Sequence, residues 1–136
     1  MASIKVADIE GIGPAFAEKL QKAGIRTVGS LLKTCCDKKG RKATAEKTGV
    51  DESKLLKWAN MADLYRIKGV GSEYSELLEA AGVDTVKELR NRNASNLHTM
   101  MLETNTKKKL VRQTPSATQV EKWVAQAKTL DPVITH

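Results

Sequence analysis

The sequence predicts an all-α protein made of two similar units of short helices. No stretch of the 136 residues alternates apolar and polar side chains with period two for long enough to form a strand, whereas apolar residues recur at helical spacing. The chain also repeats itself, because Ile9-Glu10-Gly11-Ile12-Gly13 returns 58 residues later as Ile67-Lys68-Gly69-Val70-Gly71. A chain of this length can bury one compact core or two very small ones.

The repeat extends beyond the glycines and then slips. Trp58 and Trp123 align only at an offset of 65, so the second copy carries seven additional residues ahead of its tryptophan. We expect a first unit over residues 3–65, a second over 66–131 and a tail over 132–136. We also expect the units to pack as one body, because no linker rich in Pro, Gly or Ser separates them.

The first unit is expected to hold four helices after a short helical lead-in. Gly24 follows the first of them, at a position where a left-handed C-terminal cap is usual. Thr27 is a suitable N-cap for the second, and Asp51 caps the fourth. The apolar spacing predicts the lead-in at 3–9 and helices over 14–23, 28–35, 41–48 and 52–66.

The second unit follows the same order. Ser116 with Gln119 three residues later resembles a capping box at the start of the last helix. The predicted helices cover 72–81, 86–92, 95–108 and 116–129.

Composition favours an anionic partner and excludes several protein classes. There are 23 Lys and Arg against 16 Asp and Glu, a formal net charge of +7, which points first to nucleic acid. No apolar run has the length of a membrane span or of a signal peptide. The two cysteines, Cys35 and Cys36, are adjacent and form no disulfide framework, so we expect a cytoplasmic protein.

Neither a metal nor a catalytic centre is predicted. Zinc would require more ligands than His98, His136 and the two cysteines supply at any recognisable spacing. His98 lies in no motif that would pair it with a nucleophile. We therefore expect no cofactor, no enzymatic activity and no small-molecule substrate.

The two Gly-x-Gly turns are the most informative motif. Two glycines in a tight turn between helices permit positive φ angles and a close approach by another backbone. The first amides of the following helix, together with the positive helix end, then form an anion site. The central residues, Ile12 and Val70, are expected to pack inward and hold each turn.

The segment Ile9-Glu10-Gly11-Ile12-Gly13-Pro14-Ala15-Phe16-Ala17-Glu18-Lys19-Leu20 resembles the helix-hairpin-helix motif. The continuation Ala23-Gly24-Ile25-x-Thr27-Val28 is similar to recombinase N-terminal domains and to the C-terminal domain of the bacterial RNA polymerase alpha subunit. The two-unit layout over about residues 5–130 resembles a bacterial domain-of-unknown-function family built from such hairpins.

The resemblance implies phosphate binding, because the hairpin of this family presents backbone N–H groups to one phosphate of a DNA strand. Such contacts do not read base sequence and weaken with salt. They would fall on Gly11, Ile12, Gly13 and Ala15, with Lys19 and Lys22 nearby. A weaker second site would use Gly69, Val70 and Gly71.

The chain departs from the family pattern at both turns. DNA-binding members often place Lys or Arg directly after the hairpin, where this chain has Ala15 and Glu73. Glu76 and Glu79 make the second motif helix acidic, and carboxylates repel phosphate. The second turn is therefore interpreted mainly as a tight turn between packed helices.

Basic residues gather in the predicted connecting stretch of each unit. Such clusters bind phosphates as mobile arms or serve only as solvated loops. The first consists of Lys38, Lys39, Arg41 and Lys42, and the second of Lys107, Lys108, Lys109 and Arg112. Residues 1–66 carry 13 basic against 8 acidic side chains, whereas residues 67–136 carry 10 against 8.

The aromatic residues have two interpretations. Trp58 and Trp123 could stack on the bases of a single strand. Their helical spacing with neighbouring apolar residues instead predicts core packing, as it does for Phe16 and Tyr74.

Two functions from different classes remain. One is a non-enzymatic, sequence-nonspecific DNA-binding module that uses the first turn and the basic connectors. The other is a protein-protein interaction or scaffolding domain that keeps the same fold without nucleic acid.

Overall fold

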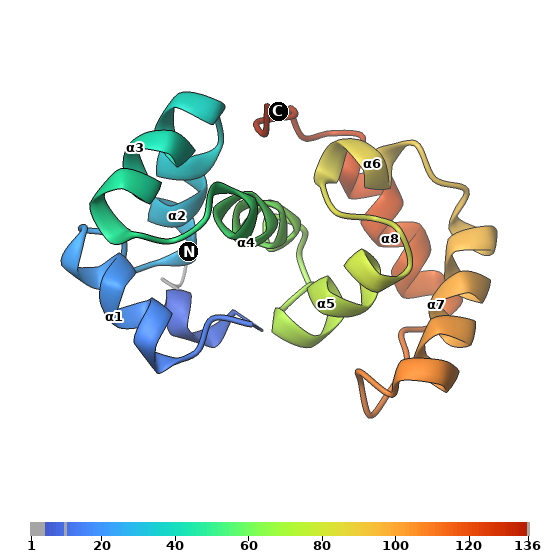
Figure 1. The fold of residues 1–136 in the computed structure, drawn as a ribbon. Helices are drawn as coiled ribbons and strands as arrows, with labels where there is room; N and C mark the ends of the chain where they lie inside the picture. The colour runs from blue at the N-terminus through green and yellow to red at the C-terminus, as the bar shows by residue number, and fades with distance from the viewer. Residues whose placement is uncertain (1–4, 10, 136) are drawn as a thin grey trace. The chain divides into compact units, whose positions relative to one another are not determined.

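The computed structural model describes residues 5–9 and 11–135, and it confirms the all-α class. Within these residues there is no strand, and a single antiparallel bridge pairs Lys5 with Thr27. The elements of Figure 1 are η1 (Val6–Asp8), α1 (Pro14–Lys22), α2 (Val28–Cys35), α3 (Lys38–Thr48), α4 (Glu52–Leu64), α5 (Ser72–Ala80), α6 (Val86–Arg90), α7 (Ala94–Lys108) and α8 (Ala117–Ala127).

The chain divides into two compact units. The first consists of Met1–Asp63 together with Val133–His136, and the second of Leu64–Pro132. The boundary falls inside the last turn of α4, so this helix leads from one unit directly into the next. Each unit contains a short helix after its glycine turn, two further helices, and a last helix that carries its tryptophan.

Local capping chemistry explains where several helices begin. Thr27 Oγ1 accepts a hydrogen bond of 3.1 Å from the Ser30 amide, which starts α2. The predicted capping box at α8 is confirmed, because Ser116 Oγ accepts from the Gln119 amide and Gln119 Oε1 accepts from the Ser116 amide. These bonds satisfy amides that a helix leaves without an intrahelical partner.

The turns after α1 and α5 are also as predicted. Gly24 and Gly82 have φ angles of 88° and 97°, which an L side chain rarely adopts. The next amides then bond back into the helix, from Ile25 to the Leu20 carbonyl and from Val83 to the Leu78 carbonyl. This bonding satisfies carbonyls at the helix end.

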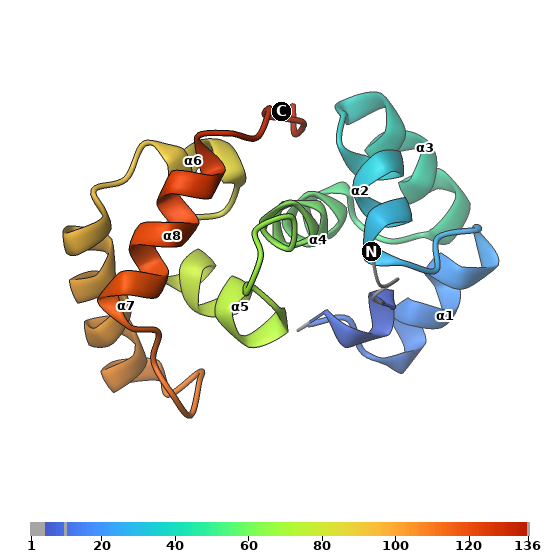
Figure 2. The same cartoon turned by 180° about the vertical axis from the view of Figure 1, so that it is seen from behind.

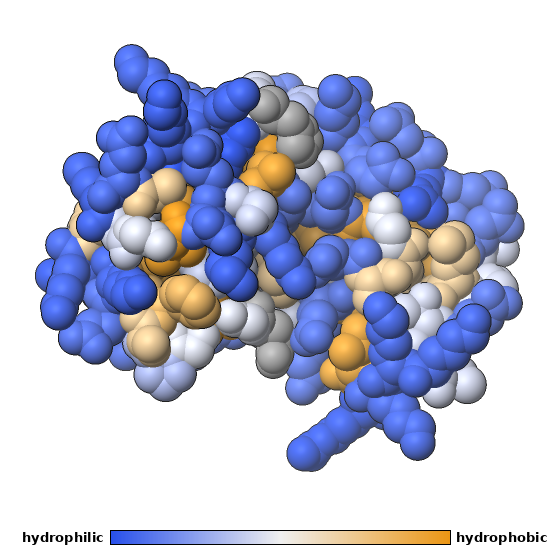
Figure 3. All heavy atoms as spheres, viewed as in Figure 1, coloured by the Kyte–Doolittle hydropathy of each residue, from blue (hydrophilic) through white to orange (hydrophobic). Residues whose placement is uncertain are grey.

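The interior of each unit is made mainly of aliphatic residues. Trp58 and Trp123 are both buried, which confirms their role in packing. In the second unit, Trp123 belongs to a continuous core that contains Leu64, Leu78 and Met101. By contrast, the face drawn in Figure 3 is covered mainly by hydrophilic side chains.

The helix containing the first basic cluster is longer than predicted. It begins at Lys38 rather than 41, because Asp37 Oδ1 accepts a 2.7 Å bond from the Gly40 amide and caps it. Lys38 and Lys39 therefore lie on α3 and not in a connecting loop. Smaller differences occur elsewhere, since α6 ends at Arg90 and α8 ends at Ala127.

The helix bounds locate the seven extra residues of the second unit. Helix α7 is four residues longer than α3, and the connection before α8 is five residues longer than that before α4. The connection before α7 is one residue longer than that before α3, whereas α6 is three residues shorter than α2. The insertion is therefore spread over the region between α6 and α8.

The C-terminal segment is attached to the first unit. The Thr135 amide donates a 2.8 Å bond to the Cys36 carbonyl. The Arg41 guanidinium donates to the Thr135 carbonyl at 2.7 Å and to the Cys35 carbonyl at 3.0 Å. Arg41 is only 3% exposed, so it ties the segment to α2 and α3. His136 lies outside the described residues.

Lys109 is expected to strain the end of α7. It adopts a left-handed conformation (φ 51°) at the C-cap, where the equivalent helix α3 ends at Gly49 (φ 75°). Because a left-handed L residue costs about 1 kcal/mol, Lys109→Gly should raise the free energy of unfolding by about that amount. Gly49→Ala should lower it by a similar amount, and urea unfolding of both variants measures the difference. An unchanged stability in Lys109→Gly would contradict the strain.

The two cysteines should differ in reactivity. Cys35 is fully buried, and burial raises the pKa of its thiol above the usual 9.0, whereas Cys36 is half-buried. A water-soluble thiol reagent should therefore modify Cys36 first, with Cys36→Ser removing the fast phase.

The raised pKa of Cys35 also predicts a pH dependence. The Cys35 thiol loses its proton at a lower pH in the unfolded chain than in the folded chain. Its contribution to the free energy of unfolding is therefore complete below about pH 9 and falls as the pH rises further. Urea unfolding at pH 7.5 and 10 should show a smaller loss in Cys35→Ala than in the wild type. An equal loss of stability in both proteins would exclude Cys35 as a source of the pH dependence.

Candidate nucleic-acid interface

The two Gly-x-Gly turns have the same backbone geometry at their first glycine. Gly11 and Gly69 have φ angles of 91° and 92°. The next residues bond back by 3.1 Å, from the Ile12 amide to the Ile9 carbonyl and from the Val70 amide to the Ile67 carbonyl. Ile12 and Val70 are each 5% exposed, so their side chains hold the turns from the inside as predicted.

The helices after these turns begin without a side-chain cap. Gly13 caps α1 and Gly71 caps α5, and neither offers a side-chain acceptor to the first-turn amides. The five other α-helices whose N-caps the structure describes do have one, supplied by Thr27, Asp37, Thr85, Asn93 and Ser116. In α1 the first helical residue is Pro14, which has no N–H, so the donors of this turn are Ala15 and Phe16.

Two lysines flank the start of α1. The Phe16 ring packs on Trp58 with 5.3 Å between ring centroids, and the outer part of Phe16 remains accessible. Lys19 Nζ and Lys54 Nζ lie 5.8 Å and 5.6 Å from the centroid of the Phe16 ring. At such distances an ammonium is attracted to a ring face, which keeps both charges at the side chain of Phe16, in the first turn of α1.

Lys22, also predicted for this site, is less available. Its ammonium lies 3.2 Å from the Glu18 carboxylate one turn earlier, and both side chains are exposed. An exposed pair of this kind is weak, so it offsets the charge of Lys22 without fixing its position.

Lys54 was not among the residues that the sequence singles out. It lies on α4, four residues before Trp58, so the two side chains share one helix face. The spacing alone gives no reason to place it at the turn. Only the packing of Trp58 on Phe16 brings Lys54 to α1.

The second turn has different polar surroundings. Tyr74 packs on Trp123 with the same 5.3 Å centroid distance. The residues at the repeat positions of Lys19 and Lys54 are Leu77 and Gln119, which carry no charge. Glu73 is exposed in the first turn of α5. The surroundings of this turn therefore suit a phosphate less well.

One contact joins the second basic cluster to the second turn. The Tyr74 hydroxyl donates a 3.0 Å bond to the Gln113 carbonyl, which holds the α7–α8 connection against α5. Arg112 directly precedes Gln113 and is exposed, as are Lys107, Lys108 and Lys109 at the end of α7. The sequence gives no signal for this contact, because Tyr74 and Gln113 lie 39 positions apart.

The first basic cluster is not a single exposed group. Lys38, Lys39 and Lys42 are exposed on α3, but Arg41 is buried and its guanidinium donates to backbone carbonyls. Arg41 therefore stabilises the unit and has no surface for a phosphate. Helices α1 and α3 lie at opposite ends of the first unit in both views (Figures 1 and 2), so the three lysines are not next to the first turn.

Neither a metal site nor a membrane-spanning helix is found in the part of the chain that is described. No group of three or more His, Cys, Asp or Glu residues there is arranged to hold a metal ion. His98 Nε2 lies 3.0 Å from the Pro115 carbonyl and so holds the connection before α8. Among the same residues, no helix combines the length and apolar character needed to cross a membrane.

The fold and site define an all-α protein with two glycine turns, each followed by a helix without a side-chain cap. A family model described as "Domain of unknown function (DUF4332)" matches residues 10–130. The chain therefore belongs to this family. No solved structure matches the chain.

The four turn glycines should differ in their tolerance of substitution. Gly11→Ala and Gly69→Ala should each destabilise the fold by about 1–2 kcal/mol, because both positions have positive φ. The loss should be larger at Gly69, where an added Cβ would lie 3.3 Å from Trp123 Nε1, against 3.9 Å from Trp58 Nε1 at Gly11.

Gly13 and Gly71 are the matched controls. An added Cβ meets nothing within 4 Å at either position, and φ is negative at both, so Ala should cost no more than about 0.5 kcal/mol. Thermal unfolding of the four variants compares them. Equal losses at Gly11 and Gly13 would contradict the role of the positive φ.

Proposed function

We propose that this protein binds DNA without sequence specificity, by placing the first glycine turn on a phosphate of the backbone. The observation that carries the proposal is the pair of α-helix starts without side-chain caps, at Gly13 and Gly71, whereas the other five α-helices with a described N-cap have a side-chain cap. A phosphate oxygen would supply the acceptor that the turn lacks. The resemblance of residues 9–20 to the helix-hairpin-helix motif supports the same interpretation.

The first turn is the better docking site on electrostatic grounds. Lys19 and Lys54 lie at the ring of Phe16, whose amide is one of the two uncapped donors, and their charges favour an approaching phosphate. At the second turn, Glu73 stands at the repeat position of Ala15, and the positions of the two lysines are uncharged. Its cations come instead from the connection that Tyr74 holds, so it contributes as a secondary contact.

The exposed lysines of α3 serve a different purpose in this proposal. Lys38, Lys39 and Lys42 lie away from the turn and increase attraction over a longer range, which raises the association rate and weakens with salt. Arg41 takes no part, because it is buried.

A protein-interaction domain is the second candidate. The specific observation that favours it is the exposure of apolar side chains on α7, with Met100 40% and Leu102 37% exposed. Exposed apolar side chains suit a protein partner better than a phosphate backbone. In that case the fold would serve as a scaffold, and DNA would bind weakly or not at all.

The turn can be tested without disturbing the fold. Gly13→Leu places a side chain over the first-turn amides of α1, at a position with open space around it, and should weaken binding to a random-sequence DNA duplex about tenfold. Gly71→Leu is the matched variant at the second turn and should have a smaller effect. Fluorescence anisotropy in 50 mM salt measures both, with circular dichroism to check folding.

The wild-type affinity should also fall steeply as salt is raised, because phosphate contacts release counterions. Affinity that is insensitive to salt, or identical in Gly13→Leu and wild type, would contradict the proposal. The second candidate would be favoured if the wild type did not bind DNA and the double variant Met100→Ser with Leu102→Ser lost a protein partner.

Two pairs of lysines separate docking from general attraction. One double variant combines Lys19→Gln with Lys54→Gln, and the other combines Lys38→Gln with Lys39→Gln. Each removes two positive charges. The first pair should weaken DNA binding several-fold more than the second, because only Lys19 and Lys54 lie beside the turn. Equal losses would show that net charge alone controls the affinity.

A further inference from the structure

We propose that the second unit has a binding pocket for a small organic anion, meaning a phosphate or carboxylate group attached to a short apolar body. The pocket is a surface hollow of about 620 Å³ between the α6–α7 connection and α8. Residues 90–94 form one wall, and Glu121, Val124, Ala125 and Lys128 form the other. It lies wholly within the unit Leu64–Pro132.

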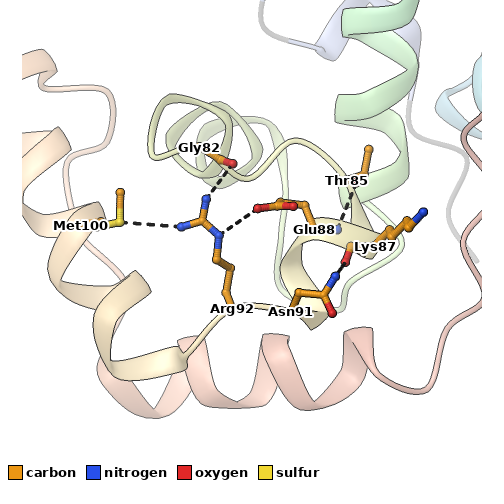
Figure 4. A network of polar contacts seen from close by, with 7 residues as sticks. All are labelled: Gly82, Thr85, Lys87, Glu88, Asn91, Arg92 and Met100. Atoms are coloured by element: carbon orange, nitrogen blue, oxygen red, sulfur yellow. Dashed lines mark hydrogen bonds and ion pairs between the residues drawn. The ribbon is translucent and has the colours of Figure 1, made fainter. Parts of the chain in front are cut away.

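Arg92 makes one wall of the pocket rigid. Its Nε lies 3.0 Å from Glu88 Oε1, Nη2 donates at 3.0 Å to the Gly82 carbonyl, and Nη1 lies 3.7 Å from the Met100 sulfur. Figure 4 shows the guanidinium turned toward Gly82 and away from α8. Arg92 therefore ties the α6–α7 connection to the turn after α5 and to α7, and its own charge is already partnered.

The asparagines of this wall are also occupied. Asn91 Nδ2 donates at 3.1 Å to the Lys87 carbonyl, and Asn93 Oδ1 accepts at 3.0 Å from the Asn96 amide. Arg90 and Lys128 are different, because neither has an ion-pair partner within the described part of the chain. These two cations, one from each wall, are the groups that remain for a ligand.

The rest of the lining gives the ligand its second property. Val124 and Ala125 are adjacent on α8, and Ala94 faces the pocket from α7. These side chains offer apolar contact next to the cations, which suits an aromatic or short aliphatic group. A guanidinium binds phosphate or carboxylate oxygens in pairs, so Arg90 would hold the anionic end.

Glu121 sets the direction of the ligand. It lies seven residues before Lys128 on α8, which corresponds to about 10 Å along a helix. A carboxylate at this end repels a second anionic group, so the pocket favours a ligand with one charged end over a polyanion.

The first unit differs at the equivalent connection. There, the connection between α2 and α3 has two residues, and a Cβ at Gly40 would collide with the Thr34 carbonyl, so α3 packs directly on α2. In the second unit, α6 is shorter and the connection has three residues. The wall formed by residues 90–94 therefore lies where the two repeats differ.

The test uses the full chain and three probes. Phenyl phosphate and benzoate share the apolar ring and differ in the anion, whereas inorganic phosphate lacks the ring. Amide chemical shifts measured during titration should locate phenyl phosphate, benzoate or both at residues 90–94 and 121–128. Inorganic phosphate should bind at least fivefold more weakly than the better of the two.

Matched variants separate the pocket from general charge. Arg90→Gln should weaken binding of the better probe about tenfold, because it removes a charged hydrogen-bond donor. Lys87→Gln removes the same charge from the same turn of α6 at a position outside the pocket and should leave binding unchanged. Glu121→Gln should strengthen it.

The outcomes are decisive in both directions. The proposal would be overturned if neither ring compound shifted the pocket amides, or if inorganic phosphate bound as tightly as both ring compounds. Equal losses of probe affinity in Arg90→Gln and Lys87→Gln would overturn it too. In Gly13→Leu the shifts at residues 90–94 and 121–128 should remain as in the wild type, which distinguishes this pocket from the first glycine turn. A loss in Gly13→Leu would instead assign the shifts to that turn.

Discussion

The structure of each unit depends on the packing of a tryptophan against a glycine turn. Gly11 and Gly69 adopt positive φ, and the indole nitrogens of Trp58 and Trp123 lie close to where a Cβ would be. The same tryptophans pack at a tilt against Phe16 and Tyr74, the third residues of the helices that follow. The last helix of each unit is thereby locked to the first, and this contact also determines which side chains surround the uncapped helix start.

The two units keep this scaffold and differ in what they attach to it. The φ angles of Gly11 and Gly69 are 91° and 92°, and the aromatic pairs have equal centroid distances. The polar side chains have diverged, because Lys19 and Lys54 correspond to Leu77 and Gln119. Extra residues in the second unit lengthen α7 and the connection to α8, and a pocket lies between the α6–α7 connection and α8. The proposed phosphate site and the proposed anion pocket are therefore properties of different units.

Much of the fold could be predicted, because its signals are local. Helical spacing, Thr27 and Ser116 as caps, and glycines after α1 and α5 each act within a few residues, and the predicted helices match the observed ones closely. The candidate site was less predictable. A run of Lys and Arg indicates charge but not exposure, so Arg41 was grouped with lysines although it is buried among carbonyls. Lys54 was overlooked, because its role depends on a contact between α4 and α1.

The sequence by itself determined the helical class, the duplication, and the glycine turns with their inward-facing Ile12 and Val70. These features follow from backbone conformation and from the period of apolar residues, which are encoded in short segments. Only the tertiary structure decided which charges surround each turn, why Arg41 is buried, and where a pocket opens. Each of these depends on side chains from distant segments, such as Tyr74 with Gln113 and Arg41 with Thr135, whose proximity exists only after the helices have packed.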